Sequence, residues 1–285
     1  MFHPIHLRPR TEAESCAAFT NCFFDSPERI CMTSLVDVPD TNFGEWHFRL
    51  LGTPVRVQPW FWLMVLLLGA QQETGAVAIW VLVCFLSVLV HEFGHVLALR
   101  AFGYRSEVIF YGWGGLTIPQ RRSYSHLRSW QQILIALSGP LAGFALAVVV
   151  CMLALAAHAE VRVGIVQFMP SLTAILPSNG ETGVALRGLI YKNVLLNDLL
   201  FVNFYWGLVN LLPIYPLDGG RVTRALFEEF DPRDGFRRSL LLSGICAAIM
   251  ALLGVARKDM YMVLVFGLLA ATSLQSRDAA GSRRR

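Results

Sequence analysis

Long apolar segments alternate with short polar segments along most of this chain. The apolar segments predict six helices, at residues 60–70, 76–99, 130–157, 194–212, 240–255 and 260–274. About 20 apolar residues are needed to cross the hydrocarbon core of a bilayer, so the first segment is short for a span. Whether residues 60–70 cross completely is left open. A further short helix, on the membrane surface, is predicted at 221–230.

Two other segments have the pattern of short strands. Residues 45–57 are rich in β-forming side chains and alternate in part, which predicts one or two strands that turn at 52–54. Residues 102–119 have a glycine-rich centre, YGWGG, between alternating apolar positions, which predicts a hairpin. Pro140 lies within the third apolar segment, so a kink or a break is expected in that helix.

The chain therefore divides into four parts. Residues 1–44 form a polar extension that is expected to be disordered or loosely packed, and Met32 is an alternative start. Residues 45–58 form the short β segment, residues 59–276 the six-helix membrane domain, and residues 277–285 a basic tail.

Composition supports a membrane protein. The 285 residues are 55% hydrophobic and only 15% charged, and the mean hydropathy is +0.51. Soluble domains contain about 25% charged residues. The net charge is +4, but the basic residues fall between the apolar segments and not on one face. This distribution is expected for membrane loops and argues against nucleic-acid binding.

The positive charges also predict an orientation. If the N-terminus is cytoplasmic and six helices span, all but five of the 24 lysines and arginines lie inside. The five outside are Arg162, Arg187, Lys192, Arg257 and Lys258. Because cytoplasmic loops carry an excess of basic residues, we predict six spans with both termini in the cytoplasm.

The second apolar segment contains the sequence HEFGH at 91–95. Residues four apart share a helix face, so His91 and His95 can bind one metal ion. Glu92 can then act as a general base on water at that ion, as in HExxH zinc sites. Gly94 is expected to leave the site open beside the second ligand. An acidic residue near the centre of a span costs about 2.5–3.5 kcal/mol, so a purely structural polar cluster is the less favoured alternative.

A catalytic zinc usually has three protein ligands, so a third ligand is needed. Asp198 lies toward the outer end of the fourth apolar segment, whereas Asp218 follows that segment on the inner side. The predicted orientation places 91–95 in the inner half of its helix, at the depth of Asp218. Residues 213–220, PIYPLDGG, have an alternative interpretation that involves no metal ligand: a simple turn where the chain leaves the membrane.

These motifs together resemble the site-2 protease family of intramembrane zinc metalloproteases. HEFGH is followed by the family's N-x-x-P-x-x-P-L-D-G pattern, at Asn210, Pro213, Pro216, Leu217, Asp218 and Gly219. YGWGG, the Ser-Gly-Pro sequence at 138–140 and GTPVRV at 52–57 also resemble family features. The resemblance covers residues 45–230 and suggests a minimal form without PDZ or nucleotide-binding CBS domains.

The resemblance implies a fold and a chemistry. It implies an all-α polytopic membrane protein with about six transmembrane helices and a short membrane-associated β-hairpin or sheet near the active site. One zinc ion per chain would be held by His91, His95 and Asp218, with Glu92 as the base and Asn210 assisting near the substrate. The substrate would be a transmembrane protein that is cleaved within the lipid bilayer and that pairs with the hairpin edge.

The same resemblance suggests a multi-pass protein of a bacterial inner membrane, with its active site toward the cytoplasm and a regulatory membrane protein as a candidate partner. The alternative is a non-proteolytic zinc-binding membrane protein or an ion carrier. A carrier should have ionisable residues across the whole bilayer depth. Here they concentrate in the inner half, which favours the protease.

Overall fold

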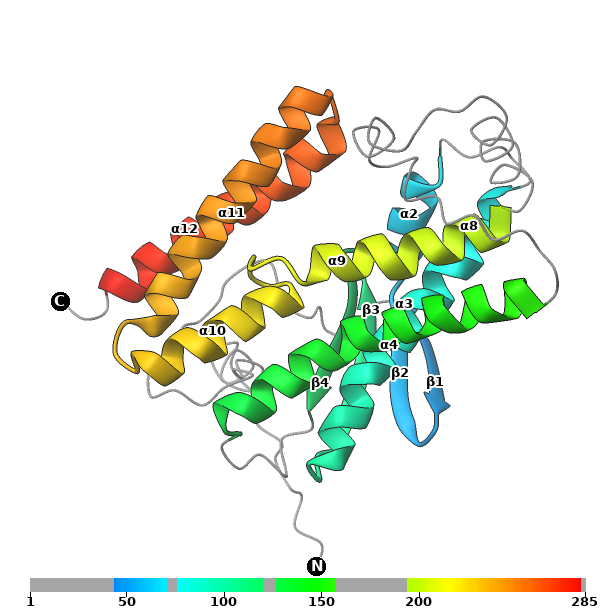
Figure 1. The fold of residues 1–285 in the computed structure, drawn as a ribbon, viewed down its shortest axis with the longest axis horizontal. Helices are drawn as coiled ribbons and strands as arrows, with labels where there is room; N and C mark the ends of the chain where they lie inside the picture. Colours follow the sequence, from blue (N-terminus) through cyan, green and yellow to red (C-terminus); the bar gives the residue numbers. More distant parts are fainter. Residues whose placement is uncertain (1–43, 71–75, 120–126, 157–193, 283–285) are drawn as a thin grey trace, which may run out of the picture. The chain divides into compact units, whose positions relative to one another are not determined.

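The computed structural model describes residues 44–70, 76–119, 127–156 and 194–282 (Figure 1). Predictions for residues 1–43 and 157–193 therefore lie outside the described residues. The elements, in chain order, are β1 (Trp46–Leu50), β2 (Thr53–Val57), α2 (Pro59–Leu68), α3 (Ala76–Ala101), β3 (Ser106–Tyr111), β4 (Gly114–Pro119), α4 (Ser129–Ala156), α8 (Val194–Leu200), the π-helix η2 (Phe201–Trp206), α9 (Gly207–Asn210), α10 (Asp218–Phe230), α11 (Gly235–Arg257) and α12 (Met260–Ser282).

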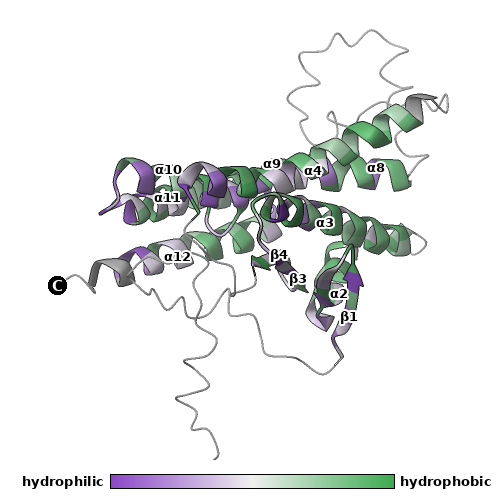
Figure 2. Ribbon diagram, turned by 90° about the horizontal axis from the view of Figure 1, so that it is seen from below, coloured by the Kyte–Doolittle hydropathy of each residue, from purple (hydrophilic) through white to green (hydrophobic). Residues whose placement is uncertain are grey.

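The fold is mostly helical, with one small sheet, as the sequence predicts. Four of the described helices are long and apolar enough to cross a membrane: α3, α4, α11 and the 260–278 part of α12. The first and fourth predicted helices form shorter apolar helices, at Pro59–Leu68 and Val194–Asn210. Figure 2 shows the hydrophobic colour along α3 and α8 and much hydrophilic colour on α10.

Two details differ from the sequence-based expectations. Of the predicted kink or break at Pro140, the break does not occur, because α4 continues on both sides of this residue. The beginning of the predicted basic tail is helical, since α12 extends to Ser282. Proline at an internal position removes one backbone hydrogen bond, which neighbouring helices can compensate in a membrane bundle.

The four strands form one sheet in the order β1-β2-β3-β4. The strands β2 and β3 are parallel, and the connection between them contains α2 and α3, whereas the other two pairs are antiparallel. The first turn lies at Leu51 and Gly52, slightly before the predicted position, and both residues have positive φ. Among the described strands, β4 pairs only with β3, so its other edge is open.

A hydrophobic core holds the sheet against α2 and α3. Phe61 of α2 lies 5.1 Å from Phe110 of β3, measured between ring centroids, and the two rings meet edge to face. Val83 and Val96 of α3 and Val108 of β3 are also buried in this core. The sheet is thus packed on α3, the helix that contains residues 91–95.

A second hydrophobic cluster involves the C-terminal helices. Ile214, in the loop before α10, is fully buried with Ala247 of α11 and with Phe266 and Ala270 of α12. This cluster connects the helical hairpin α11–α12 to the loop that leads to Asp218.

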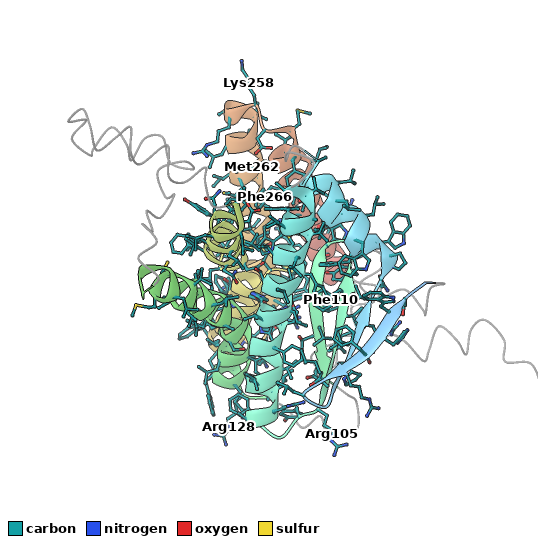
Figure 3. The ribbon with its side chains drawn as sticks, turned by 90° about the vertical axis from the view of Figure 1, so that its right-hand side faces the viewer. Arg105, Phe110, Arg128, Lys258, Met262 and Phe266 are labelled. Atoms are coloured by element: carbon teal, nitrogen blue, oxygen red, sulfur yellow. The ribbon has the colours of Figure 1, made fainter. Side chains whose placement is uncertain are left out.

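Basic residues lie at opposite ends of the helices. Figure 3 shows Arg105, after α3, and Arg128, before α4, at one end, and Lys258, between α11 and α12, at the other. This agrees with the predicted assignment of these loops to different sides of a bilayer.

Candidate metal centre

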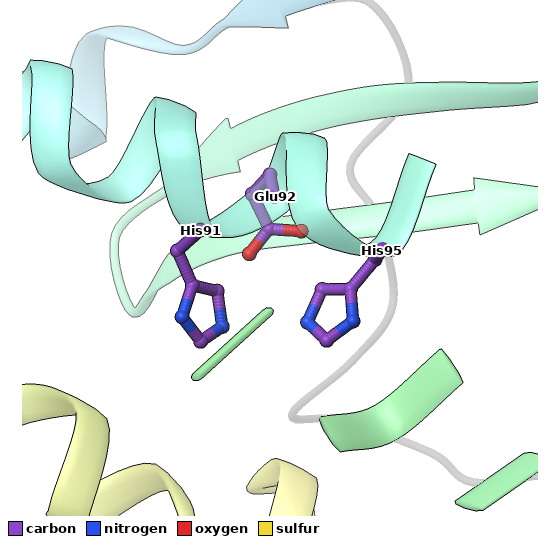
Figure 4. Close-up of side chains that lie close together, drawn as sticks. All are labelled: His91, Glu92 and His95. Carbon is purple, nitrogen blue, oxygen red and sulfur yellow. The ribbon is translucent and has the colours of Figure 1, made fainter. Parts of the chain in front are cut away.

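Three polar side chains project from one part of α3 (Figure 4). Each of His91, Glu92 and His95 has a ligand atom within 4.8 Å of those of the other two. Glu92 and His95 are 4% and 3% exposed, so these polar groups lie in the protein interior. The one-turn spacing of the two histidines explains their common direction, because helix positions i and i+4 lie on one face.

Asp218, the first residue of α10, meets both histidines. Its Oδ2 atom lies 3.0 Å from His91 Nε2 and 3.4 Å from His95 Nε2. Ligand atoms bound to one tetrahedral ion at about 2.0–2.1 Å stand about 3.3 Å apart. Both distances to Asp218 are close to this separation, and ligand atoms of the two histidines lie within 4.8 Å of each other. The three residues are therefore close enough together to hold a single metal ion.

Glycines after Asp218 bring this residue into the site. A Cβ atom on Gly219 would collide with the carbonyl oxygen of Leu211, and one on Gly220 would lie 2.5 Å from the Ile214 carbonyl carbon. The loop between α9 and α10 can fold onto the start of α10 only because both positions lack a side chain. Asp198 is instead buried on α8, where its Oδ2 has no hydrogen-bond partner among the described residues.

Gly139 allows α4 to pass directly beside the two imidazoles. A Cβ atom here would collide with His95 Nε2 and would lie 2.7 Å from His91 Nε2. Gly94 has a related function, because a Cβ atom there would collide with the Ser138 carbonyl oxygen. The structure thus assigns Gly94 a packing function, since it permits the close approach of α4, and its expected function of keeping the site open stays a prediction.

The carbonyl oxygen of Ile135 orients His95. It lies 2.7 Å from His95 Nδ1, and it also accepts a 2.6 Å hydrogen bond from the Ser138 hydroxyl. A carbonyl accepts only from a protonated nitrogen, so this contact selects the tautomer with hydrogen on Nδ1. The lone pair of Nε2 is then directed at the candidate metal position, as is usual for histidine ligands.

Two further polar contacts involve the carboxylates of Asp218 and Glu92. Arg221 Nη1 lies 3.5 Å from Asp218 Oδ1. Burial alone would raise the pKa of Asp218, but the two histidines and Arg221 together hold this pKa below its usual range. The hydroxyl of Thr117, on β4, donates a 2.6 Å hydrogen bond to Glu92 Oε2.

Tyr111, at the end of β3, is a neutral group near the site. Burial raises the pKa of the Tyr111 hydroxyl to about 12. The positive charge of Arg221 lowers this pKa, whereas the negative charge of Glu92 raises it. Its hydroxyl therefore stays protonated at neutral pH and can donate a hydrogen bond.

The fourth apolar segment carries two asparagines. Asn210, predicted to assist near the substrate, is the half-buried last residue of α9, and this role stays a prediction. Asn203 is buried in η2 and donates to Ser87 Oγ of α3 and to the Leu199 carbonyl oxygen. The π-helical turn thus places Asn203 at the contact between α3 and the fourth apolar segment.

Sequence reasoning missed the roles of Gly139, Ile135, Thr117 and Arg221. The Ser-Gly-Pro sequence drew attention to Gly139, and the PLDGGR sequence ends at Arg221, but neither pattern shows what the residue contacts. No sequence signal distinguishes Thr117 from an ordinary strand threonine.

Comparison with known proteins places these features in a family. The sequence model of peptidase family M50 matches residues 79–253, more than half of the chain. The chain belongs to peptidase family M50. With four helices long and apolar enough to span, this M50 member is a multi-pass membrane protein.

Both a sequence search and a structure search match this M50 member to a protein of Methanocaldococcus jannaschii. The chain is 25% identical, over 232 residues, to zinc metalloprotease MJ0392, and the match covers 79% of this chain and 58% of that protein. The fold is similar to the solved structure of the site-2 protease, with a TM-score of 0.51 and 21% identity. That alignment covers 82% of this chain and 95% of the solved chain. The match thus spans somewhat more than half of the length of MJ0392.

Proposed function

We propose that this protein is an intramembrane zinc metalloprotease that hydrolyses peptide bonds within or next to transmembrane segments of membrane proteins. One observation carries the proposal. Asp218 Oδ2 lies 3.0 Å from His91 Nε2 and 3.4 Å from His95 Nε2, Glu92 lies beside the histidines, and both histidines belong to a helix apolar enough to cross a membrane. Family M50 membership and the similarity to zinc metalloprotease MJ0392 support the same reaction.

A zinc ion bound here would polarise the scissile carbonyl and lower the pKa of an attacking water. Glu92 accepts the proton of that water as its oxygen bonds to the carbonyl carbon. Glu92 then gives a proton to the leaving amine nitrogen as the C–N bond breaks, so atoms and charges balance. Asn210 is the proposed amide donor to the oxyanion.

The open edge of β4 is the proposed contact for the substrate. An extended segment can add to a sheet edge through backbone hydrogen bonds. Gly115 of β4 touches the Glu92 side chain, since a Cβ atom at this glycine would lie 2.6 Å from Glu92 Oε1. A substrate paired with β4 would thus have an unwound peptide bond beside the proposed base.

We also propose that the site faces the cytoplasm of a bacterial cell. His95 lies one and a half turns before Arg100, and Figure 3 shows Arg105 at the same end of the bundle as Arg128. Arginine-rich loops favour the cytoplasmic side. A regulatory membrane protein is the second proposed partner, to be sought by crosslinking in membranes.

The test uses the full chain in proteoliposomes with single-span membrane proteins as substrates. We expect one zinc per chain and cleavage by the wild type. The Glu92→Gln variant should keep its zinc but lose cleavage. Glu107→Gln, on β3, is the matched control and should cleave normally. Bound zinc with no cleavage of any substrate would favour a non-proteolytic zinc protein or carrier.

A further inference from the structure

We propose that Thr117 is a positioning residue that holds the Glu92 carboxylate in the orientation needed for proton transfer. The inference rests on the proposed function, because it concerns the base of that reaction. Thr117 belongs to β4, the strand with the open edge, and not to either motif of the sequence.

The hydrogen-bond geometry is the first support. Thr117 Oγ1 lies 2.6 Å from Glu92 Oε2 and 3.3 Å from the Glu92 main-chain oxygen. A hydroxyl has one hydrogen, and the shorter contact identifies the carboxylate oxygen as its acceptor. A separation of about 2.5–2.7 Å is typical of a hydroxyl bonded to an ionised carboxylate.

Burial makes this contact important. Thr117 is 2% exposed and Glu92 is 4% exposed. A buried carboxylate needs polar partners to stay charged and ordered. In the part of the chain that the structure describes, the Thr117 hydroxyl is the only side-chain donor within hydrogen-bonding distance of this carboxylate.

The neighbouring Gly115 lets the Glu92 side chain pack closely against β4. Gly115 and Thr117 are two residues apart, so they lie on the same face of β4. A side chain at Gly115 would occupy the space beside Glu92 Oε1, as its Cβ would lie 2.6 Å from that atom. The strand therefore holds Oε2 through Thr117 and, because Gly115 lacks a side chain, lets the Glu92 side chain lie directly against it.

The test compares Thr117→Val, which keeps the shape but removes the hydroxyl, with Thr117→Ser, which keeps the hydroxyl. We expect Thr117→Val to lower kcat by about 10- to 100-fold, the usual effect of removing an orienting contact. KM and zinc content should stay at the wild-type values. Thr117→Ser should recover most of kcat. Thr272→Val, on α12, removes a hydroxyl bonded to its own helix and is the matched control.

A second readout does not depend on activity. In the metal-free protein, Thr117→Val should lower the Tm when Glu92 is present and lower it less in a Glu92→Ala background. This non-additivity would show that the two residues interact directly.

The outcomes separate the two proposals. Cleavage by the wild type, none by Glu92→Gln, and wild-type kcat for Thr117→Val would overturn the role of Thr117 and leave the proposed function intact. Equal losses of kcat and zinc in Thr117→Val and Thr117→Ser would show a structural role and also overturn it. Cleavage by Glu92→Gln would overturn the assigned base, and the positioning role with it.

Discussion

The backbone N–H of Tyr215 donates a 2.8 Å hydrogen bond to the hydroxyl of Ser243. Tyr215 lies three residues before Asp218, and Ser243 lies on α11. Ser243 also shares a 2.9 Å hydrogen bond with Ser273 of α12. The loop that carries the proposed third zinc ligand is thereby attached to both C-terminal helices.

Removal of this attachment should loosen the position of Asp218. Ser243→Ala deletes the acceptor of a partly buried backbone N–H, and a typical hydrogen bond contributes about 0.5–1.5 kcal/mol to stability. We expect a lower Tm and weaker zinc binding, measured by competition with a chromogenic chelator. Ser239→Ala is the control, because the Ser239 hydroxyl donates to the Phe236 carbonyl oxygen of its own helix. Unchanged zinc affinity in Ser243→Ala would show that the loop does not need this anchor.

Gly139→Ala should destroy the metal centre. The added methyl group would occupy the space of His95 Nε2 and lie close to His91 Nε2, so the imidazoles or α4 must move. Overpacking of this kind costs about 1–3 kcal/mol in stability. We expect loss of bound zinc and of cleavage, measured by metal analysis and substrate assay. Gly267→Ala, where a Cβ would contact nothing within 4 Å, should behave as the wild type. Full zinc occupancy in Gly139→Ala would contradict this arrangement.

Asp198 and Asp218, which are both buried, should respond differently to substitution. Asp218→Asn removes a charged ligand, and zinc affinity should fall by more than the roughly 10- to 100-fold expected for a residue outside the ligand shell. Asp198→Asn, on α8, should retain zinc. Metal content after dialysis against a weak chelator measures both. Zinc loss in Asp198→Asn together with retention in Asp218→Asn would reverse the assignment of the third ligand.

Removal of zinc should destabilise the fold as well as stop cleavage. A ligand that binds only the folded state, at about 1,000 times its Kd, contributes about 4 kcal/mol to stability. Treatment with a strong chelator should therefore lower the Tm and abolish cleavage, and added zinc should restore both. Glu92→Gln should show the same shift in Tm without activity. Chelator-resistant cleavage would exclude a metal-dependent mechanism.

Much of the site could be predicted from local sequence. The spacing of His91 and His95 places both on one helix face, and the hydropathy of the surrounding residues predicts the helix that carries them. The distribution of arginines predicted an orientation in which Asp218, and not Asp198, has the same depth as the two histidines. The alternating residues of β3 and β4, with a glycine-rich turn, also predicted the hairpin.

Other features depend on contacts between distant segments. His91 and Asp218 are 127 residues apart, and only the folded chain brings them to 3.0 Å. The passage of α4 at Gly139 and the hydrogen bond of Thr117 to Glu92 are also contacts between separate elements. Helical and strand periods determine which residues of one segment share a face. Tertiary packing decides which face of a segment contacts which neighbouring segment. In this packing, small residues allow two backbones to approach closely, and individual polar groups form hydrogen bonds across the contact.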